Sequence, residues 1–395
     1  MLVFFLAIPY VLIVFWLIRR SLAWTASCHG FCHRKVFKIP LIALSVFFAV
    51  SPLLGFLLPN SHVQHFLQRV SDFWLGVLLY TILAVAAALL IKFVLKMTRR
   101  IPPAKFAEKK VFARVGGFMA VVIAAVSIFG AVHYHDVKET HYDASIDKPG
   151  SDFTIVLISD LHMGYNTGVK ELSKDVDMIN SMDPDIVCIA GDIFNNDYDA
   201  LADPDKMSAI FRNINSKYGV YASYGNHDVS EPLLCGFTFS SDKHPVSDPR
   251  MDSFLKKSNI KLLMDESVLI DNQFYLAGRR DDEKPGRGSK TRMSADRLLS
   301  GLDKSKPIIV MDHSPSEIHQ LSSAGCDLAL SGHTHNGQLF PMNITSKLMW
   351  ENPAGELKIG NMTSIVSSGI GVFGPGMRVG TDSEIVKIDV DLEQQ

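Results

Sequence analysis

The chain has 395 residues, of which 47% are hydrophobic and 20% charged, with a formal net charge of -2 and a mean hydropathy of +0.16. This apolar content excludes a disordered chain, and the near-neutral charge argues against a nucleic-acid binder that relies on bulk positive charge. A positive mean hydropathy is unusual for a water-soluble enzyme, and the excess lies almost entirely before about residue 134. The five cysteines are too few for a disulfide scaffold.

Four apolar stretches occupy the first third of the chain, at Leu2–Ile18, Phe37–Leu58, Phe73–Leu95 and Val115–Tyr134. About 20 helical residues cross the ~30 Å hydrocarbon layer of a bilayer, and each stretch is near that length. The first stretch lacks a preceding basic segment and a clear cleavage site, which favours a retained helix over a secretion signal. Residues 1–134 are therefore predicted to form four transmembrane helices.

The loops between these stretches differ in charge. Basic residues are concentrated in the first loop, with Arg19 and Arg20, and in the third loop, with Lys109 and Lys110. Because positively charged loops stay on the cytoplasmic face, both termini and the rest of the chain are predicted to lie outside the cytoplasm. The sequence thus predicts a multi-pass cell-membrane protein with an extracytoplasmic domain.

Beyond the apolar third, short β-rich runs alternate with helical patterns. Thr154–Ser159, Ile186–Ala190 and Ile308–Met311 are examples of such runs, and segments with helical periodicity lie between them. This order is typical of an α/β domain with helices covering sheet faces. Residues 135–150 are predicted to be a linker, and residues 151–395 a single domain.

Residue types that bind metals follow these strand candidates in five blocks. The blocks are Ser159-Asp160-Leu161-His162, Ala190-Gly191-Asp192, Tyr224-Gly225-Asn226-His227-Asp228, Met311-Asp312-His313 and Ser331-Gly332-His333-Thr334-His335. Ligand sites form at the carboxyl ends of α/β strands because the loops converge there. Two divalent ions about 3.5–4 Å apart can activate a nucleophile and clamp phosphoryl oxygens, and mixed imidazole and carboxylate donors suit Mn, Fe or Zn. The pattern predicts a two-metal site for attack on a phosphoester, with Asp192 placed to reach both ions.

In this order and context, the blocks resemble the D-x-H, G-D, G-N-H-[DE], H and G-H-x-H motifs of the calcineurin-like metallophosphoesterase superfamily. Residues 332–338 resemble its bacterial membrane-associated branch. The resemblance covers about residues 151–390. It implies an α/β fold in which two mixed β-sheets flanked by helices form a four-layer sandwich, here preceded by a four-helix transmembrane region.

The resemblance also implies roles for individual residues. One ion would be bound by Asp160, His162, Asp192 and His335. The other would be bound by Asp192, Asn226, His313 and His333. His227 would protonate the leaving oxygen or stabilise the phosphoryl charge.

Two further features bear on the site. Many members of the superfamily have an aspartate three residues after the bridging aspartate, where it orients the catalytic histidine, but Asn195 occupies that position here. Arg279 and Arg280 begin a charged loop, and guanidinium groups suit phosphate oxygens. A phosphate-binding role for these arginines and a solvated loop remain equal alternatives.

Together these features predict a membrane-anchored hydrolase that uses two divalent ions (Mn, Fe or Zn) and metal-hydroxide attack to cleave a phosphomonoester or phosphodiester. Anchoring by four spans favours a lipid-linked substrate at the bilayer surface. One alternative is a catalytically slow membrane sensor or scaffold that retains the metal site. Another is a nuclease or protein phosphatase of the same superfamily, although the sequence shows no aromatic, basic groove pattern and no nucleic-acid partner is expected.

Overall fold

The computed structural model describes residues 2–99, 101–234, 237–238 and 245–393. The chain divides into two compact units, residues 1–129 and residues 130–395, which we call the membrane unit and the catalytic unit. The membrane unit is built from long helices joined by the short 3-10 helices η1 (Gly30–His33) and η2 (Pro103–Ala107). These long helices are α1 (Leu2–Cys28), α2 (Lys35–Leu57), α3 (His62–Met97) and α4 (Lys109–His133), the last of which ends inside the catalytic unit.

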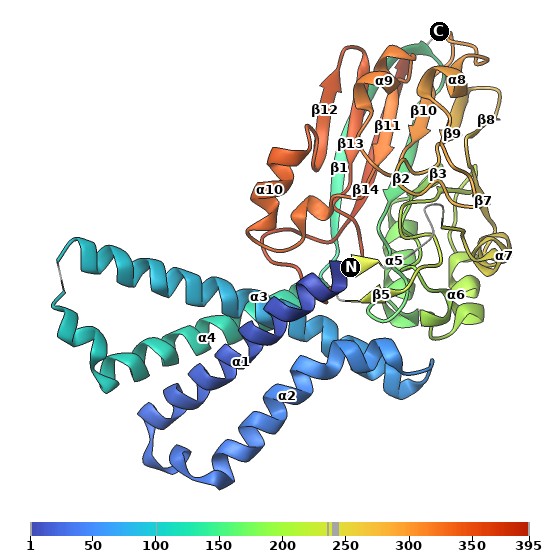
Figure 1. The fold of residues 1–395 in the computed structure, drawn as a ribbon. Coiled ribbons are helices and arrows are strands. Elements are labelled where there is room, and N and C mark those ends of the chain that lie inside the picture. The colour runs from blue at the N-terminus through green and yellow to red at the C-terminus, as the bar shows by residue number, and fades with distance from the viewer. Residues whose placement is uncertain (1, 100, 235–236, 239–244, 394–395) are drawn as a thin grey trace. The chain divides into compact units, whose positions relative to one another are not determined.

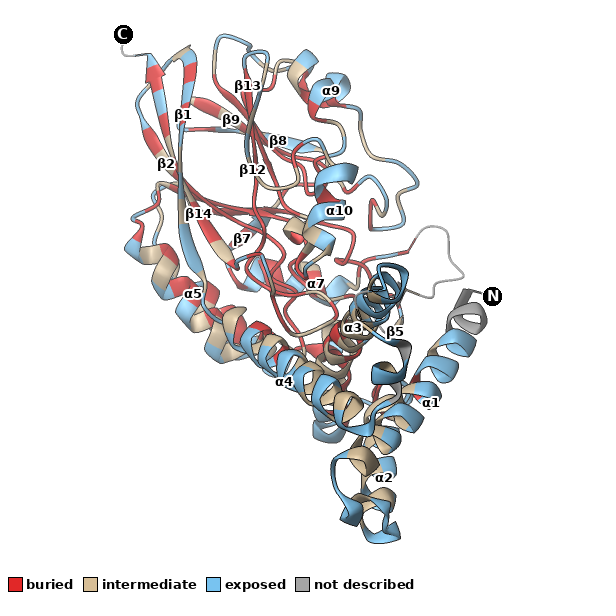
Figure 2. Ribbon diagram, turned by 90° about the vertical axis from the view of Figure 1, so that its left-hand side faces the viewer, coloured by how far each residue is buried: buried red, intermediate tan, exposed pale blue. Residues whose placement is uncertain are grey.

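All four helices are long and apolar enough to cross a membrane, which confirms the predicted transmembrane region. Most of their side chains are exposed or half-buried (Figure 2), as expected for helices whose apolar surface faces lipid. The helices are longer than the apolar stretches: α1 continues through Arg19 and Arg20, and α3 begins at His62. Hydropathy detects only the part of a helix that lies in hydrocarbon, whereas Arg, Lys and Gln prolong a helix readily into the interface.

The catalytic unit contains two six-stranded mixed sheets (Figure 1). The first has the order β1 (Lys138–Pro149), β14 (Glu384–Glu393), β2 (Phe153–Ile158), β3 (Ile186–Ala190), β4 (Val220–Ser223) and β7 (Ile260–Leu262). The second has the order β12 (Gly355–Ile359), β13 (Met362–Val366), β11 (Leu328–Ser331), β10 (Ile308–Met311), β9 (Phe274–Gly278) and β8 (Glu266–Ile270). A separate hairpin is formed by β5 (Leu233–Leu234) and β6 (Phe237–Thr238).

Helices pack on the outer face of each sheet. α5 (Val169–Ser181), α6 (Pro204–Phe211) and α7 (Pro249–Lys257) pack on the first sheet, and α8 (Ala295–Leu299) and α9 (Ile318–Ser323) pack on the second. The catalytic unit also contains α10 (Met342–Met349) and the 3-10 helices η3 (Tyr198–Ala200) and η4 (His335–Gly337). Because side chains alternate along a strand, β2 sends Ile155 and Leu157 between the sheets and Val156 and Ile158 toward the helices. The result is the predicted four-layer sandwich.

The segment 135–150 is not the linker that was predicted. Residues Lys138–Pro149 form β1, which pairs in parallel with β14 along almost its whole length. Of its side chains, Ala144 and Ile146 are the buried ones, so the strand lacks the apolar run by which buried strands are detected. Since β1 lies at the sheet edge, one partner strand and a few apolar contacts suffice to hold it.

One buried carboxylate of α5 makes the stability of the catalytic unit dependent on pH. Burial, followed by the nearby charge of Glu171, raises the pKa of Asp175 to about 7. The folded state then binds more protons than the unfolded state between about pH 4 and pH 7, so stability falls as pH rises through that range.

We therefore expect Asp175→Asn to stabilise the protein on the alkaline side of this range, by up to about 4 kcal/mol, and less on its acidic side. Thermal unfolding of the full chain at about pH 5 and pH 8 measures this difference. An equal shift of the melting temperature at both pH values would contradict the expectation.

Candidate metal centre

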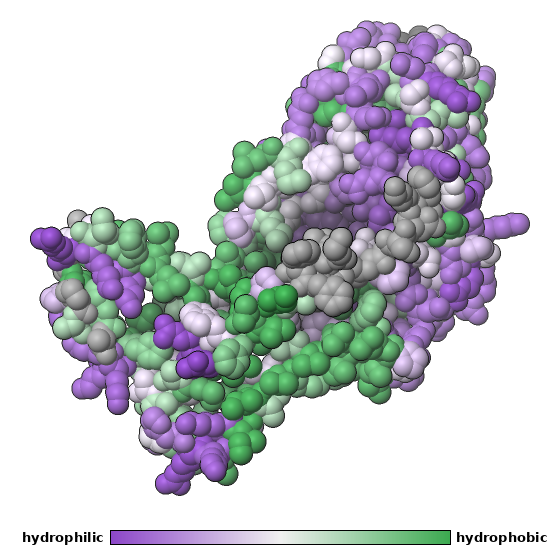
Figure 3. All heavy atoms as spheres, viewed as in Figure 1, coloured by the Kyte–Doolittle hydropathy of each residue, from purple (hydrophilic) through white to green (hydrophobic). Residues whose placement is uncertain are grey.

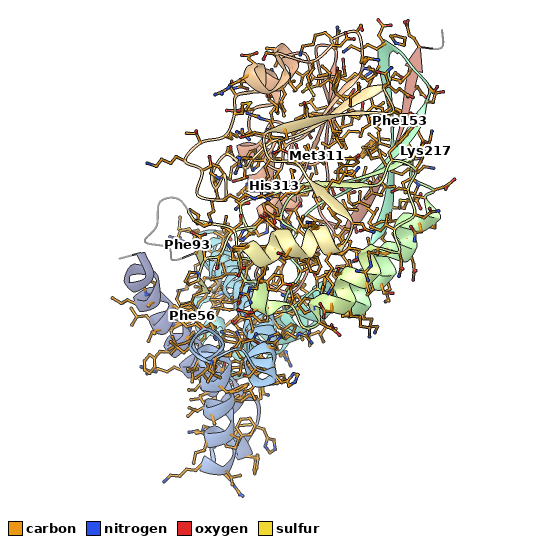
Figure 4. The ribbon with its side chains drawn as sticks, turned by 90° about the vertical axis from the view of Figure 1, so that its right-hand side faces the viewer. Phe56, Phe93, Phe153, Lys217, Met311 and His313 are labelled. Carbon is orange, nitrogen blue, oxygen red and sulfur yellow. The ribbon has the colours of Figure 1, made fainter. Side chains whose placement is uncertain are left out.

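The predicted ligands converge because the strands that carry them run in the same direction. β2, β3 and β4 are parallel neighbours in the first sheet, and β10 and β11 are parallel neighbours in the second. Asp160 and His162 follow β2, Asp192 follows β3, and His313 lies two residues beyond Met311, the last residue of β10 (Figure 4). The carboxyl ends of both sheets thus contribute to one site, as predicted.

The loops that aim these side chains have unusual backbone conformations. Asp160, His162, Asp192, His333 and His335 all have positive φ values, between 42° and 73°. Non-glycine residues rarely adopt this left-handed region, and several together persist only where the surrounding structure enforces them. The surroundings do so here: a Cβ atom added to Gly332 would lie 2.3 Å from Oδ2 of Asp160. The fold therefore holds strained turns at the residues that were predicted to bind metal.

The first cluster consists of Asp160, His162 and His335, and all three side chains are buried. Nε2 of His162 lies 3.1 Å from Nε2 of His335, which in turn lies 3.3 Å from Oδ1 of Asp160. Oδ2 of Asp192 is 3.6 Å from Nε2 of His162. The four residues predicted to hold the first ion are therefore neighbours.

The second cluster is built around His313, which is completely buried. Its Nδ1 donates to the carbonyl oxygen of Ala190 at 2.8 Å, so its Nε2 is directed at Oδ2 of Asp192, 3.2 Å away. Nδ1 of His333 lies 3.3 Å from Nε2 of His313 and 3.1 Å from Oδ1 of Asn226. The hydrogen bond to the carbonyl oxygen of Ala190 fixes the ring of His313, and such a bond is the usual support of a metal-binding histidine. Asp192 contacts residues of both clusters.

The charges and donors of this site fit divalent cations. Asp160 and Asp192 are buried carboxylates, and buried charges are normally paired or bound to metal. Burial opposes the ionisation of Asp192, yet the histidines around it, above all His313, lower the pKa of Asp192 well below the ordinary value. The pKa of His313 is correspondingly raised by Asp192 in spite of burial. Imidazole nitrogens and carboxylate oxygens directed at shared points suit Mn, Fe or Zn better than Ca.

His227 lies at the edge of the clusters. Its backbone N–H donates to Oδ1 of Asp192 at 2.8 Å, and its ring centroid lies 4.4 Å from that of Phe373 and 5.1 Å from that of His162. Burial lowers its pKa to about 3. The side chain is thus positioned next to the predicted ions by the backbone that also anchors Asp192.

The residue that orients His227 is Asn196. Its Oδ1 accepts a hydrogen bond from Nδ1 of His227, whereas the side chain of Asn195, which occupies the position predicted from the family pattern, interacts with His162. Asn196 has a φ of 60°, and this left-handed turn places the fourth residue after Asp192 where the third was expected. The amide that takes the place of the family's orienting aspartate is therefore that of residue 196.

We expect Asn196→Ala to lower kcat about 10–100-fold, the usual cost of removing a residue that orients an active-site group. Asn195→Ala is the matched control and should have a smaller effect on kcat. The metal content of Asn196→Ala, measured by elemental analysis, should equal that of the wild type, because the side chain of Asn196 contacts His227 and does not belong to the clusters. A larger loss of kcat in Asn195→Ala than in Asn196→Ala would show that Asn195, and not Asn196, orients His227.

Arg279 and Arg280 do not line the site. Arg279 is completely buried, and its guanidinium pairs with Asp312 at 2.6 Å and with Glu317 at 2.8 Å. Arg280 donates to backbone carbonyl groups of its own loop and lies 3.5 Å from Asp265. Neither phosphate binding nor a solvated loop, the two alternatives left open by the sequence, describes these contacts, because both guanidinium groups hold loops of the domain together.

A different arginine supports the site and was missed. The buried guanidinium of Arg378 donates to the carbonyl oxygens of Ser368, Gly369 and Gly371, and Nη2 lies 3.4 Å from Nδ1 of His335. Burial lowers its pKa to about 10. The loop that it holds packs against the backbone of Asp160, to which Gly371 donates at 2.8 Å. Its only sequence signal was its place in a glycine-rich loop.

Comparisons with known proteins agree with this geometry. A family model described as calcineurin-like phosphoesterase matches residues 153–337. An uncharacterized metallophosphoesterase of Campylobacter jejuni is 30% identical over 274 residues, which cover 69% of this chain and 67% of that protein. A transmembrane protein with metallophosphoesterase domain from Danio rerio is 29% identical over 345 residues, covering 82% and 75%. UDP-2,3-diacylglucosamine pyrophosphatase LpxG of Chlamydia trachomatis is 26% identical over 239 residues, covering 50% and 70%.

The fold and the site define a metal-dependent phosphoric ester hydrolase. Its catalytic domain comes after a membrane-spanning region in the chain. The chain belongs to the calcineurin-like phosphoesterase family, whose members depend on two metal ions.

Proposed function

We propose that this protein hydrolyses a phosphomonoester or phosphodiester of a lipid-linked substrate, using two divalent ions held by seven side chains. The observation that carries the proposal is the buried pair of clusters described above, which share the carboxylates of Asp160 and Asp192. The ligands are Asp160, His162, Asp192 and His335 for one ion, and Asp192, Asn226, His313 and His333 for the other. When bound, such ions lower the pKa of a nucleophilic water and neutralise charge on the phosphoryl oxygens.

The protein's own residues position the two clusters and the side chain of His227. Asp192 lies between His162 and His313 and sets the separation of the two clusters. His227 contacts the phosphoryl group or the leaving oxygen, and the hydrogen bond to Asn196 keeps its ring in place. Phe373 packs against the ring of His227. No covalent intermediate with the protein is required.

The membrane region supports a substrate at the bilayer. Four spans exceed what simple anchoring needs, and the relative from Chlamydia trachomatis is a UDP-2,3-diacylglucosamine pyrophosphatase, whose name denotes a lipid-linked nucleotide. The excess of basic residues in the first and third loops of the membrane unit favours an extracytoplasmic catalytic unit. A reporter fused after the last residue tests this orientation, and activity of a cytoplasm-only reporter would reverse it.

Metal removal and substrate screening test the proposed function together. We expect the purified full chain to lose hydrolysis of a chromogenic phosphodiester after chelation and to regain it with Mn, Fe or Zn. Incubation of the reloaded enzyme with a membrane lipid extract should release phosphate or a phosphorylated headgroup, detected by mass spectrometry. Full activity in the chelated, metal-free enzyme would overturn the metal site, and release from soluble extracts alone would overturn the lipid-linked substrate.

A further inference from the structure

Helix α10 of the catalytic unit presents its apolar side chains to the outside. Ile344, Leu348 and Met349 are 52%, 83% and 76% exposed, whereas the buried residue of the helix is the polar Ser346. An ordinary surface helix packs its apolar face against the core. The reversed arrangement of α10 indicates that an apolar environment covers it from outside, because exposed apolar patches mark sites of interaction with proteins or membranes.

This apolar surface is concentrated in one segment, which we call the α10 surface: Phe340, Met342, Ile344, Leu348 and Met349. Elsewhere in the described part of the catalytic unit, the exposed large apolar side chains beyond residue 133 are Val246 and Leu269. Figure 3 shows hydrophobic side chains gathered over α10. Single apolar residues scattered over a surface are normal, whereas a cluster of this kind marks a surface that is covered in the working protein.

The α10 surface begins beside the end of the fourth membrane span. The backbone N–H of Phe340 donates to the carbonyl oxygen of Val379 at 2.8 Å, and the N–H of the preceding Arg378 donates to that of Gly130 at 3.0 Å. Gly130 lies in the last turn of α4 and belongs to the catalytic unit. The α10 surface therefore lies next to the point at which the chain leaves the bilayer. The membrane is the apolar environment available to cover it.

The same helix is connected to the metal centre at both ends. It follows η4, which contains His335, and Trp350 directly after it packs with its ring centroid 5.4 Å from that of His333.

We propose that α10 lies in the interface of a phospholipid bilayer, with the α10 surface among the acyl chains and the metal centre facing the headgroups. Resting on the proposed function, this arrangement lets a lipid-linked substrate reach the metals while its acyl chains stay in the bilayer. Interfacial helices of this kind bury their apolar face by about 5–10 Å and keep cations at headgroup level, a place that the exposed Lys347 can take.

Depth measurement tests the proposal without reference to any substrate. Leu348→Cys, made in the full chain with Cys28, Cys32 and Cys235 replaced by serine, is labelled with a polarity-sensitive fluorophore and reconstituted into vesicles of equimolar phosphatidylcholine and phosphatidylglycerol. We expect a blue-shifted emission that brominated phosphatidylcholine quenches. The matched control is Leu269→Cys, an exposed apolar position on β8, which should not be quenched.

A label at residue 348 that brominated lipid does not quench would overturn the proposal. If its emission is nevertheless blue-shifted, a protein partner or a second copy of the chain covers α10 instead. An unshifted emission would place the helix in water.

Activity measurement tests the consequence for the enzyme. The double variant Leu348→Glu and Met349→Glu should lose about tenfold or more in hydrolysis of a vesicle-embedded lipid diester, because charges on the apolar face weaken interfacial binding. Its hydrolysis of a soluble chromogenic diester should remain unchanged. Equal losses on both substrates would make α10 merely structural and overturn the proposal. If the wild type cleaves no lipid diester, the proposed substrate fails, and the quenching result alone decides the position of α10.

Discussion

Replacing Asp192 with asparagine is expected to abolish phosphodiester hydrolysis, with a loss of roughly 10³-fold or more. Loss of a single group that stabilises transition-state charge already costs about 10²–10³-fold, and Asp192 contacts both metal clusters as well as the backbone of His227. The isosteric amide keeps the shape of the side chain but removes its charge. Elemental analysis of the purified variant should show fewer metal ions per chain than the wild type.

The matched control for this variant lies at the other end of the same strand. Asp185 immediately precedes β3, and its carboxylate accepts the backbone N–H of Thr154 at 2.8 Å. Asp185→Asn removes one aspartate charge from the same strand and should keep wild-type activity and metal content. Full activity of Asp192→Asn would contradict the bridging role, and a slow wild type with the same rate as the variant would favour the sensor alternative.

Sequence reasoning singled out residues that the structure brings together, because histidines and aspartates directly follow several buried strands. Asp160, Asp192 and His313 each follow an apolar run that can be recognised without a structure, and parallel strands bring their ends together. Four membrane spans were equally evident, because an apolar run of about 20 residues is typical of a helix that crosses a bilayer.

Features that depend on chain geometry could not be predicted in the same way. Asn196, rather than Asn195, reaches His227 because a left-handed turn shifts the register by one residue. Arg279 seemed suited to phosphate, but its partners Asp312 and Glu317 come from loops that only the folded chain brings near. The sequence shows which residue types are present and how far apart they lie along the chain. The tertiary structure decides which of the charged side chains pair with one another.

Two neighbouring strands of the first sheet, β1 and β14, were missed for a related reason. β1 is mostly polar, and its membership of the first sheet rests on backbone pairing with β14. β14 alternates apolar residues such as Ile388 and Val390 with acidic ones, which is the pattern of a strand, but it lies beyond the last recognised motif. The domain therefore begins at the end of α4 and extends to its last described strand.

Replacing His227 with alanine is expected to lower kcat by about 10²–10⁴-fold, the usual contribution of a general acid or base, while metal content stays at the wild-type level. His227 lies next to the clusters, and its ring nitrogen Nδ1 is engaged by Asn196. The other nitrogen, Nε2, is therefore available to the substrate. A phosphate group beside this nitrogen favours the charged, proton-donating form of the ring, because opposite charges stabilise each other.

The dependence on the leaving group identifies what His227 does. A proton donor matters most when the departing oxygen is strongly basic, so the loss in His227→Ala should be largest for alkyl phosphodiesters and should shrink for diesters of acidic phenols. His227→Gln is the matched variant, since its amide can still donate a hydrogen bond but cannot deliver a proton. If His227→Ala loses the same factor for every leaving group and His227→Gln restores the rate, the side chain stabilises phosphoryl charge instead. If metal content falls as well, His227 supports the ligands rather than the substrate.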